Sequence, residues 1–110
     1  MIKIKIATDF SKTPGARFPE EGEFSGKEFR ENLLLPKLQQ AIKEKTKLEI
    51  NLDNTVGMGT SFLEEAFGGL IRENHIEYTK IKDTIIFVSK DDPEYINEIK
   101  LYMEEANAKK

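Results

Sequence analysis

The sequence predicts an α/β fold in which helices pack on a small sheet. Some short segments alternate apolar and polar residues, as strands do, whereas longer segments repeat apolar residues every three or four positions, as amphipathic helices do. These segments follow one another as strand, helix, strand, helix, strands and helix, which is the order of a layered α/β protein. The 110 residues suffice for one core, and we expect residues 1–110 to form a single domain.

The first strand is predicted near residue 2. Ile2, Ile4 and Ile6 alternate with lysines, which indicates one buried face. Residues 7–24 hold two prolines and two glycines and are predicted to be a long irregular loop. Such a loop is either functional or a plain connection, here with a short strand near residues 16–18.

The first long helix is predicted to begin at Ser25. Glu28 follows three residues later, which is a capping-box pattern. Pro36 lies inside this helix and removes one backbone hydrogen bond, so we expect a kink, or two short helices that meet at Leu35–Pro36. The residues expected on the apolar face are Phe29, Leu33, Leu34, Leu38, Ala41 and Ile42.

The centre of the predicted fold is a strand over residues 48–52, a loop over 53–59 and a helix from residue 60. Gly68 and Gly69 stand inside this helix, where each glycine costs about 1 kcal/mol relative to alanine. Either the helix packs closely on the sheet there, or a partner helix lies in the notch. The apolar residues of the helix, spaced by four in two rows, are Phe62, Ala66 and Leu70, then Leu63, Phe67 and Ile71.

The remaining residues predict two strands and a last helix. Residues 76–81 suggest a strand, Lys82–Asp83 a tight turn, and Ile85–Val88 a strand buried on both faces because its apolar run is continuous. Asp92 and Pro93 are expected as the N-cap and the first residue of the last helix. The residues of that helix expected to face the core are Ile96, Ile99, Met103 and Ala106.

Composition argues against several classes of function. The net charge is −3 with no dominant basic face, which is unlike a nucleic-acid-binding protein. There is no cysteine, and His75 is the single histidine, so we expect no transition-metal site and no cofactor. No apolar run has the length of a membrane span, and we expect a cytoplasmic protein without membrane contact.

Several polar side chains are predicted to meet at one edge of the sheet. A right-handed crossover makes the first two strands parallel, so the loops that follow them emerge at the same edge. Ligands and partners of open α/β sheets bind at that edge. The side chains expected there are Asp9, Arg17, Asp53, Thr60 and Ser61.

The start of the central helix is a candidate anion site. Gly57 and Gly59 let the backbone approach a ligand, and the first amides of a helix attract a phosphate, either bound or carried on Thr60 or Ser61. The alternative is that Ser61 only caps the helix, because Glu64 completes a capping box.

Two further residues at this edge have alternative roles. Arg17 either recognises an anion beside Ser61 or forms a salt bridge with Asp9, Asp53 or Glu21. Asp53 either binds a partner or caps its own loop.

The Thr60–Ser61 pair after an acidic loop resembles the STAS domain of anti-sigma-factor antagonists. In that family the loop carries Asp-Ser-Ser-Gly, and the second serine is phosphorylated by a partner ATPase-kinase of the GHKL type. Ser61 matches that serine and Thr60 its neighbour, whereas Gly59 replaces the family's aspartate and Phe62 its glycine.

A closer likeness is to the bacterial STAS-like family DUF4325. The segments that carry it are 14–17, 21–30, 34–36 and 59–70. The resemblance implies a STAS-like fold, for which we expect a mixed sheet of four to five strands with three main helices. It also implies a regulatory role beside a histidine-kinase-like ATPase.

From these observations we expect a regulatory protein-interaction domain and no enzymatic activity. The phosphate acceptors would be Ser61 and Thr60, and the contacts to an anion or partner would come from Arg17, Asp53, Gly57, Gly59 and Phe62. The alternative is a sensor that binds a nucleotide or another small anion at the same edge.

Overall fold

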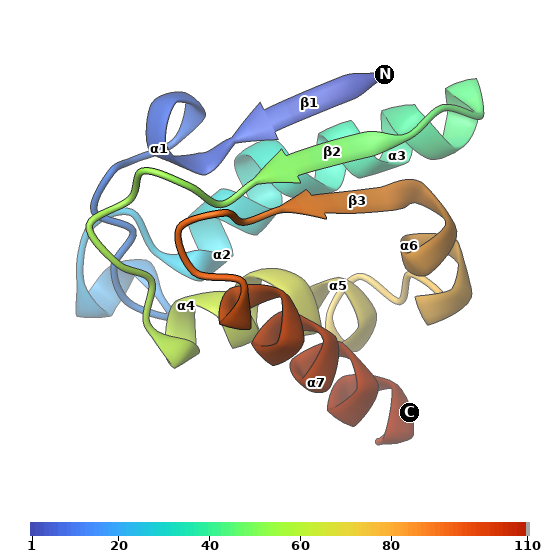
Figure 1. The fold of residues 1–110 in the computed structure, drawn as a ribbon. Coiled ribbons are helices and arrows are strands. Elements are labelled where there is room, and N and C mark those ends of the chain that lie inside the picture. The colour runs from blue at the N-terminus through green and yellow to red at the C-terminus, as the bar shows by residue number, and fades with distance from the viewer. Residues whose placement is uncertain (110) are drawn as a thin grey trace.

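A three-stranded parallel sheet and one layer of helices make up residues 1–109, the part of the chain that the computed structural model describes (Figure 1). The strands are β1 (Ile2–Lys5), β2 (Leu48–Asn51) and β3 (Ile85–Val88), in the spatial order β1-β2-β3. Both pairs are parallel, so the predicted parallel pairing of the first two strands is confirmed. The expected mixed sheet of four to five strands is not found in residues 1–109.

The segment predicted as a third strand is a helix, α6 (Tyr78–Thr84). Ile81 and Thr84 are buried and Tyr78 is half-buried, a spacing of three that fits one face of a helix. The alternation of Ile76 and Tyr78 suggested a strand, but the next apolar residue follows after three positions. Lys82–Asp83 is therefore part of this helix and not a turn.

Three longer helical segments form the second layer, as expected, and each connects or follows a strand. Between β1 and β2 the chain forms α1 (Ile6–Asp9), the 3₁₀ turn η1 (Pro19–Glu21), α2 (Gly26–Phe29), the π-helical turn η2 (Arg30–Leu34) and α3 (Leu35–Glu44). Between β2 and β3 it forms α4 (Thr60–Leu63), the π-helical turn η3 (Glu64–Gly68), α5 (Gly69–Arg72) and α6; α7 (Glu94–Ala108) follows β3. Segments 26–44 and 60–72 are each continuous.

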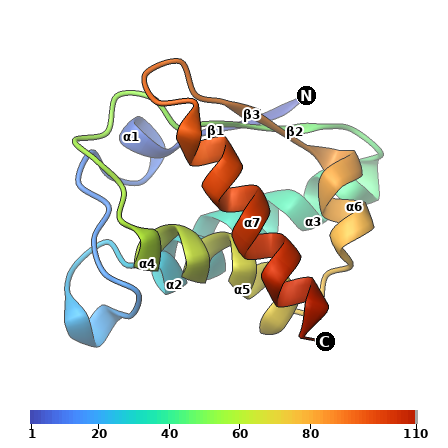
Figure 2. The same ribbon diagram turned by 60° about the horizontal axis from the view of Figure 1, so that its bottom comes forward.

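The long helices lie on one side of the sheet (Figures 1 and 2). Strands that are added in chain order through right-handed crossovers place every connecting helix on the same face. The other face is therefore open, and Ile86 on it is 40% exposed. The prediction that β3 is buried on both faces is wrong for this reason. The outward-facing partners in register are Lys3 with Glu49 and Ile86, and Lys5 with Asn51 and Val88.

Aromatic rings join the central helix to its neighbours inside the core. Phe62 packs between Phe10 and Phe29, with ring centroids 6.2 and 5.7 Å away. Phe67 meets the ring of Phe87 on β3 edge-on, at 5.5 Å. The central helix is thus fixed both to the sheet and to the helix before it.

The predicted helix starts are mostly confirmed. Ser25 and Glu28 form the expected capping box, and Pro36 stands in the first turn of α3, directly after a π-helical turn. The start predicted for the last helix is one residue too early: Pro93 is the N-cap of α7 and Glu94 its first residue, while Asp92 accepts a hydrogen bond from the Glu94 amide at 3.1 Å.

Residues 16–18 are not a strand. The carbonyls of Ala16 and Arg17 instead accept hydrogen bonds from Gly26 and Lys27, which ties the long loop to the start of α2.

Candidate functional site

The loops that follow the three strands meet at one edge of the sheet, which we call the rim. The amide of Val56 donates to the carbonyl of Lys12 at 2.8 Å, which joins the loops after β1 and β2. Asp53 accepts hydrogen bonds from the amides of Lys90 and Asp91, at 2.7 and 2.8 Å, which joins the loops after β2 and β3. The predicted convergence of the first two loops is confirmed.

Residues 54–61, the rim segment, are anchored through their backbone. The amide of Asn54 donates to Asp91 at 2.9 Å, and the amide of Met58 donates to the Tyr95 hydroxyl at 3.2 Å. Between these anchors Val56 is 83% exposed. A fixed backbone therefore presents a bare apolar side chain to solvent.

Gly57 and Gly59 have no structural reason within the fold to be glycines. A Cβ atom at either position would have no neighbour within 4 Å, and neither residue adopts a left-handed backbone conformation. A glycine is normally needed where the backbone is strained or closely approached. Here the open space lies outside the domain, next to the start of α4.

Ser61 and Thr60 are exposed at the beginning of the central helix. The residue that caps the helix is Gly59, whose extended backbone precedes Thr60, so the predicted capping box at Ser61 is wrong. Ser61 is the second residue of the helix, two positions after the N-cap. Its hydroxyl is thus not explained by capping.

Two of the residues predicted to contact a partner instead make contacts within the domain. Phe62 is fully buried in the core, because its row of apolar residues faces the sheet side, so it offers no surface to a partner. Asp53 is only 7% exposed, and its carboxylate braces the loop before α7. It neither caps its own loop nor faces solvent.

Arg17 pairs with Glu64, and not with any of the three carboxylates predicted for it. Its guanidinium also lies 3.6 Å from Glu65. Arg17 is held by the backbone bonds that tie residues 16 and 17 to the start of α2, and this places it over the central helix. It is brought close to the helix that carries Ser61, but its charge is already engaged.

Glu64 and Glu65 are the centre of an ionic cluster with three arginines. Arg30 and Glu65, both about 2% exposed, are joined at 2.5 Å. Arg72 bonds Glu64 at 2.5 Å and Glu65 at 3.1 Å. Burial alone would raise the pKa of Glu64, but hydrogen bonds from Arg72 and Arg17, with their charges, outweigh it and hold that pKa below its usual value.

This cluster was missed from the sequence, although a signal exists. Gly26 stands four residues before Arg30, and Gly69 stands four residues after Glu65, so each helix has a small residue on the face of its charged one. A Cβ atom at Gly69 would overlap the Arg30 guanidinium, and one at Gly26 would lie 3.0 Å from the Cβ of Glu65. Gly69 thus makes room for Arg30, and not for the sheet.

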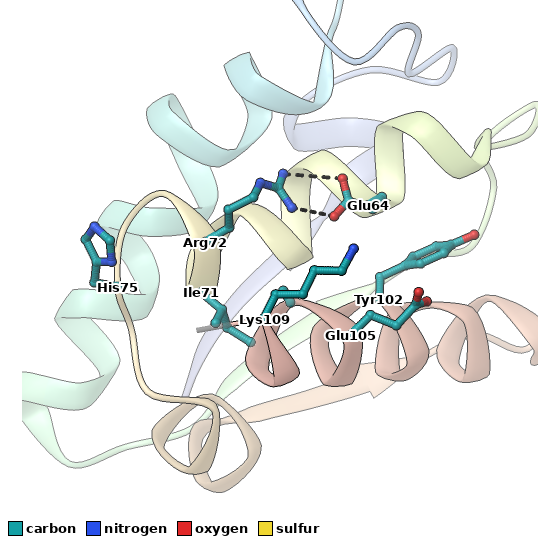
Figure 3. A pocket seen from close by; sticks show the side chains of 8 residues that line it. Glu64, Ile71, Arg72, His75, Tyr102, Glu105 and Lys109 are labelled. Atoms are coloured by element: carbon teal, nitrogen blue, oxygen red, sulfur yellow. Dashed lines mark hydrogen bonds and ion pairs between the residues drawn. The ribbon is translucent and has the colours of Figure 1, made fainter.

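A cleft of about 750 Å³ separates the end of the central helix from α7 (Figure 3). Arg72 reaches back to Glu64 on one side, and Tyr102, Glu105 and Lys109 line the other. Burial and then the charges of neighbouring glutamates raise the pKa of Tyr102, so its hydroxyl stays protonated at neutral pH. Two acidic and two basic side chains balance each other, so the cleft selects an ion of neither sign.

The described residues offer neither a metal site nor a membrane span. Within residues 1–109 there is no group of three or more His, Asp or Glu side chains arranged to hold a metal ion. Of the helices described, none combines the length and apolar composition needed to cross a bilayer.

Sequence comparison assigns the family. The model of the STAS-like domain of unknown function, DUF4325, matches residues 25–94. The chain belongs to this family. The DUF4325 match runs from the capping box of α2 to the start of α7, and so includes the rim segment and Arg30, Glu65 and Arg72. No curated protein and no solved structure matches the chain.

Proposed function

We propose that this DUF4325 domain is a regulatory domain that binds a protein partner through its rim segment. The observation that carries the proposal is Val56, 83% exposed on a loop whose backbone is hydrogen-bonded on both sides. A preorganised loop loses little conformational freedom on binding, so its apolar contact contributes more of its energy to affinity. The open space beside Gly57 and Gly59 gives a partner access to the loop and to the helix start.

Phosphorylation of Ser61 would switch this contact. The proposed partner is a GHKL-type ATPase, which transfers the γ-phosphoryl group of ATP to the Ser61 hydroxyl and releases ADP. A phosphate on the second residue of a helix is stabilised by unpaired amides and by the helix dipole. The nearby carboxylates of Glu64 and Glu65 are paired with arginines, which reduces their repulsion of the phosphate.

Binding to a purified GHKL-type ATPase from the same genome, measured by calorimetry, tests the contact. Val56→Ser is expected to weaken binding at least tenfold, because it removes the exposed apolar side chain of the rim segment. The matched control is Leu101→Ser, since Leu101 is 53% exposed on α7, outside the rim. Equal effects of the two substitutions would rule out the rim segment as the interface.

Mass spectrometry tests the phosphorylation. After incubation of the domain with the ATPase and ATP, a peptide that contains Ser61 should gain one phosphate, and Ser61→Ala should abolish the gain. Transfer of the phosphate to Thr60 in the Ser61→Ala variant would show that the neighbouring hydroxyl is a second acceptor. An unchanged peptide mass would remove the switch and leave the binding proposal to the calorimetry.

The second candidate function is a sensor of nucleotides or other anions at the same edge. It is favoured by the open space beside the two glycines, where helix amides are accessible. A nucleotide panel in a thermal-shift assay separates it from the first candidate, because a ligand that binds only the folded state raises its melting temperature. Gly59→Val would block such a ligand, so a shift that this variant keeps would argue against the site.

A further inference from the structure

A second, smaller cavity of about 230 Å³ lies beside the ionic cluster, away from the rim. Four basic side chains and two acidic ones line it together with Phe18: Arg17, Lys27, Arg30 and Arg72 against Glu65 and Glu73. Arg17 and Arg72 also pair with Glu64, which lies outside the lining, so the surplus is one positive charge on a chain whose net charge is −3. It marks a place where an anion is attracted locally by an otherwise acidic protein.

The charges at this cavity are not balanced by the contacts within residues 1–109. One oxygen of Glu65 accepts from Arg30, and the other lies 3.1 Å from Arg72 and 3.6 Å from Arg17. The Glu65 carboxylate is thereby fully engaged. Lys27 has no ion-pair partner among the described residues, so its positive charge is in excess.

Arg30 supplies an unused donor from the inside of the fold. It is 2% exposed, and its Nη1 donates to the carbonyl and the carboxylate of Glu65, at 2.6 and 2.5 Å. Its Nε is buried and has no hydrogen-bond partner in residues 1–109. A buried donor without an acceptor costs about 1–3 kcal/mol, and the Arg30 side chain that carries it lines the cavity.

The backbone around Arg30 is also irregular. Arg30 begins the π-helical turn η2, and Glu65 lies in the π-helical turn η3, so the two irregular turns face each other across this ion pair. Turns of this kind are rare and frequently occur at functional sites. Gly69 leaves the space that the Arg30 guanidinium occupies, because any larger residue would overlap it.

We propose that this cavity binds one small oxyanion, a phosphate or carboxylate group, between Lys27, Arg17 and Arg30. The guanidinium groups match the planar or tetrahedral arrangement of oxygens on such a group, and Lys27 adds a point charge. The site joins the long loop, through Arg17, to the first helix and to the central helix. Binding therefore stabilises the contact between these three segments.

The test is a thermal-shift titration with inorganic phosphate, and separately with acetate, with chloride added to keep the ionic strength constant. Wild type is expected to show a saturable rise in melting temperature with at least one of the two oxyanions, because only the folded state has the site. Phosphate and acetate together identify which oxygen arrangement fits. A rise equal to that given by chloride, or no rise, would overturn the proposal.

Lys27→Gln is the specific variant. Lys27 is half-buried, and its substitution removes no ion pair among the described residues. It is expected to raise the oxyanion concentration at half-saturation at least tenfold. Lys37→Gln is the matched control: Lys37 is also half-buried and helical, but lies on α3, away from the cavity, and should leave the titration unchanged. Identical titrations for both variants would refute the site. Because the rim is untouched, the partner-binding assay is unaffected by either outcome.

Discussion

Arg30 and Glu65 form a buried pair whose two charges depend on each other. Taking a single charge out of water costs several kcal/mol, so each side chain is tolerated only because the other lies at 2.5 Å. Glu65 shares its second oxygen with Arg72, about two turns later on the same helix. The pair therefore fixes the relative position of two helices through one polar contact.

Neutralising Glu65 should destabilise the domain strongly. Glu65→Gln leaves the Arg30 charge buried without a counter-charge, and we expect a loss of about 3–5 kcal/mol in the free energy of unfolding, measured by urea denaturation. Glu31→Gln is the control, because Glu31 is exposed on the helical segment that carries Arg30, and its effect should stay within about 0.5 kcal/mol. Equal losses in both variants would contradict the importance of the buried pair.

Glu64 should make stability depend on pH in the acidic range. Its pKa is lowered in the folded state, so its contribution is fully present above the ordinary value of 4.5 and is lost as the pH falls through the lowered folded value. The stability difference between wild type and Glu64→Gln, measured in urea at pH 7, is expected to shrink toward zero below pH 4.5. A difference that stays constant across this range would show that Glu64 is not held by Arg17 and Arg72.

At the scale of elements, the packing of the first two long helical segments depends on Gly26. A Cβ atom there would lie 2.6 Å from the carbonyl oxygen of Phe62 and 3.3 Å from the amide nitrogen of Ala66. Both are backbone atoms, which cannot move aside as a flexible side chain can. The two helices are therefore as close as a glycine allows, and this closeness places Arg30 beside Glu65.

Gly26→Ala should force these helices apart and cost about 1–3 kcal/mol in stability. The matched control is Gly59→Ala, because a Cβ atom at Gly59 meets nothing within 4 Å and the backbone there suits any residue. That variant should be unchanged or slightly more stable, since alanine restricts the unfolded chain. Thermal or urea unfolding of both proteins checks the difference, and a neutral Gly26→Ala would disprove the close approach.

Local patterns in the sequence predicted β1, β2, β3 and the capping box at Ser25, because each depends on neighbours a few residues away. The partner of Arg17 lies 47 residues along the chain, and no local pattern identifies it. The helical state of residues 78–84 and the exposed face of β3 were missed as well. The exposed face of β3 depends on which side of the sheet the helices cover, and this is a tertiary property. Residues 78–84 were misread because the alternation of Ile76 and Tyr78 was given more weight than the spacing of three from Tyr78 to Ile81 and Thr84.

At the scale of the molecule, the parallel order of the three strands brings the loops that follow them to one edge. Asp53 holds the last two of these loops together, and its carboxylate is the shared acceptor for two amides of the loop before α7. The rim segment gains its fixed conformation from this bracing and from the Tyr95 hydroxyl. The surface proposed for a partner is thus a product of the whole topology.

Removing the brace should loosen the rim and leave the rest of the domain ordered. In Asp53→Ala, hydrogen exchange of the Lys90 and Asp91 amides, followed by NMR, is expected to accelerate at least tenfold, because both lose their acceptor. Amides of β2 should exchange as in wild type. Unaltered exchange at Lys90 and Asp91 would mean that Asp53 does not join these loops.

The most direct test of the proposed function is a hydrogen-exchange footprint of the domain bound to its GHKL-type ATPase. The proposal predicts slower exchange in the rim segment, residues 54–61, and in the adjoining loop near Lys12, whose carbonyl accepts from the Val56 amide. Protection confined to the outer face of β1, β2 and β3, with the rim segment exchanging as in the unbound domain, would contradict it.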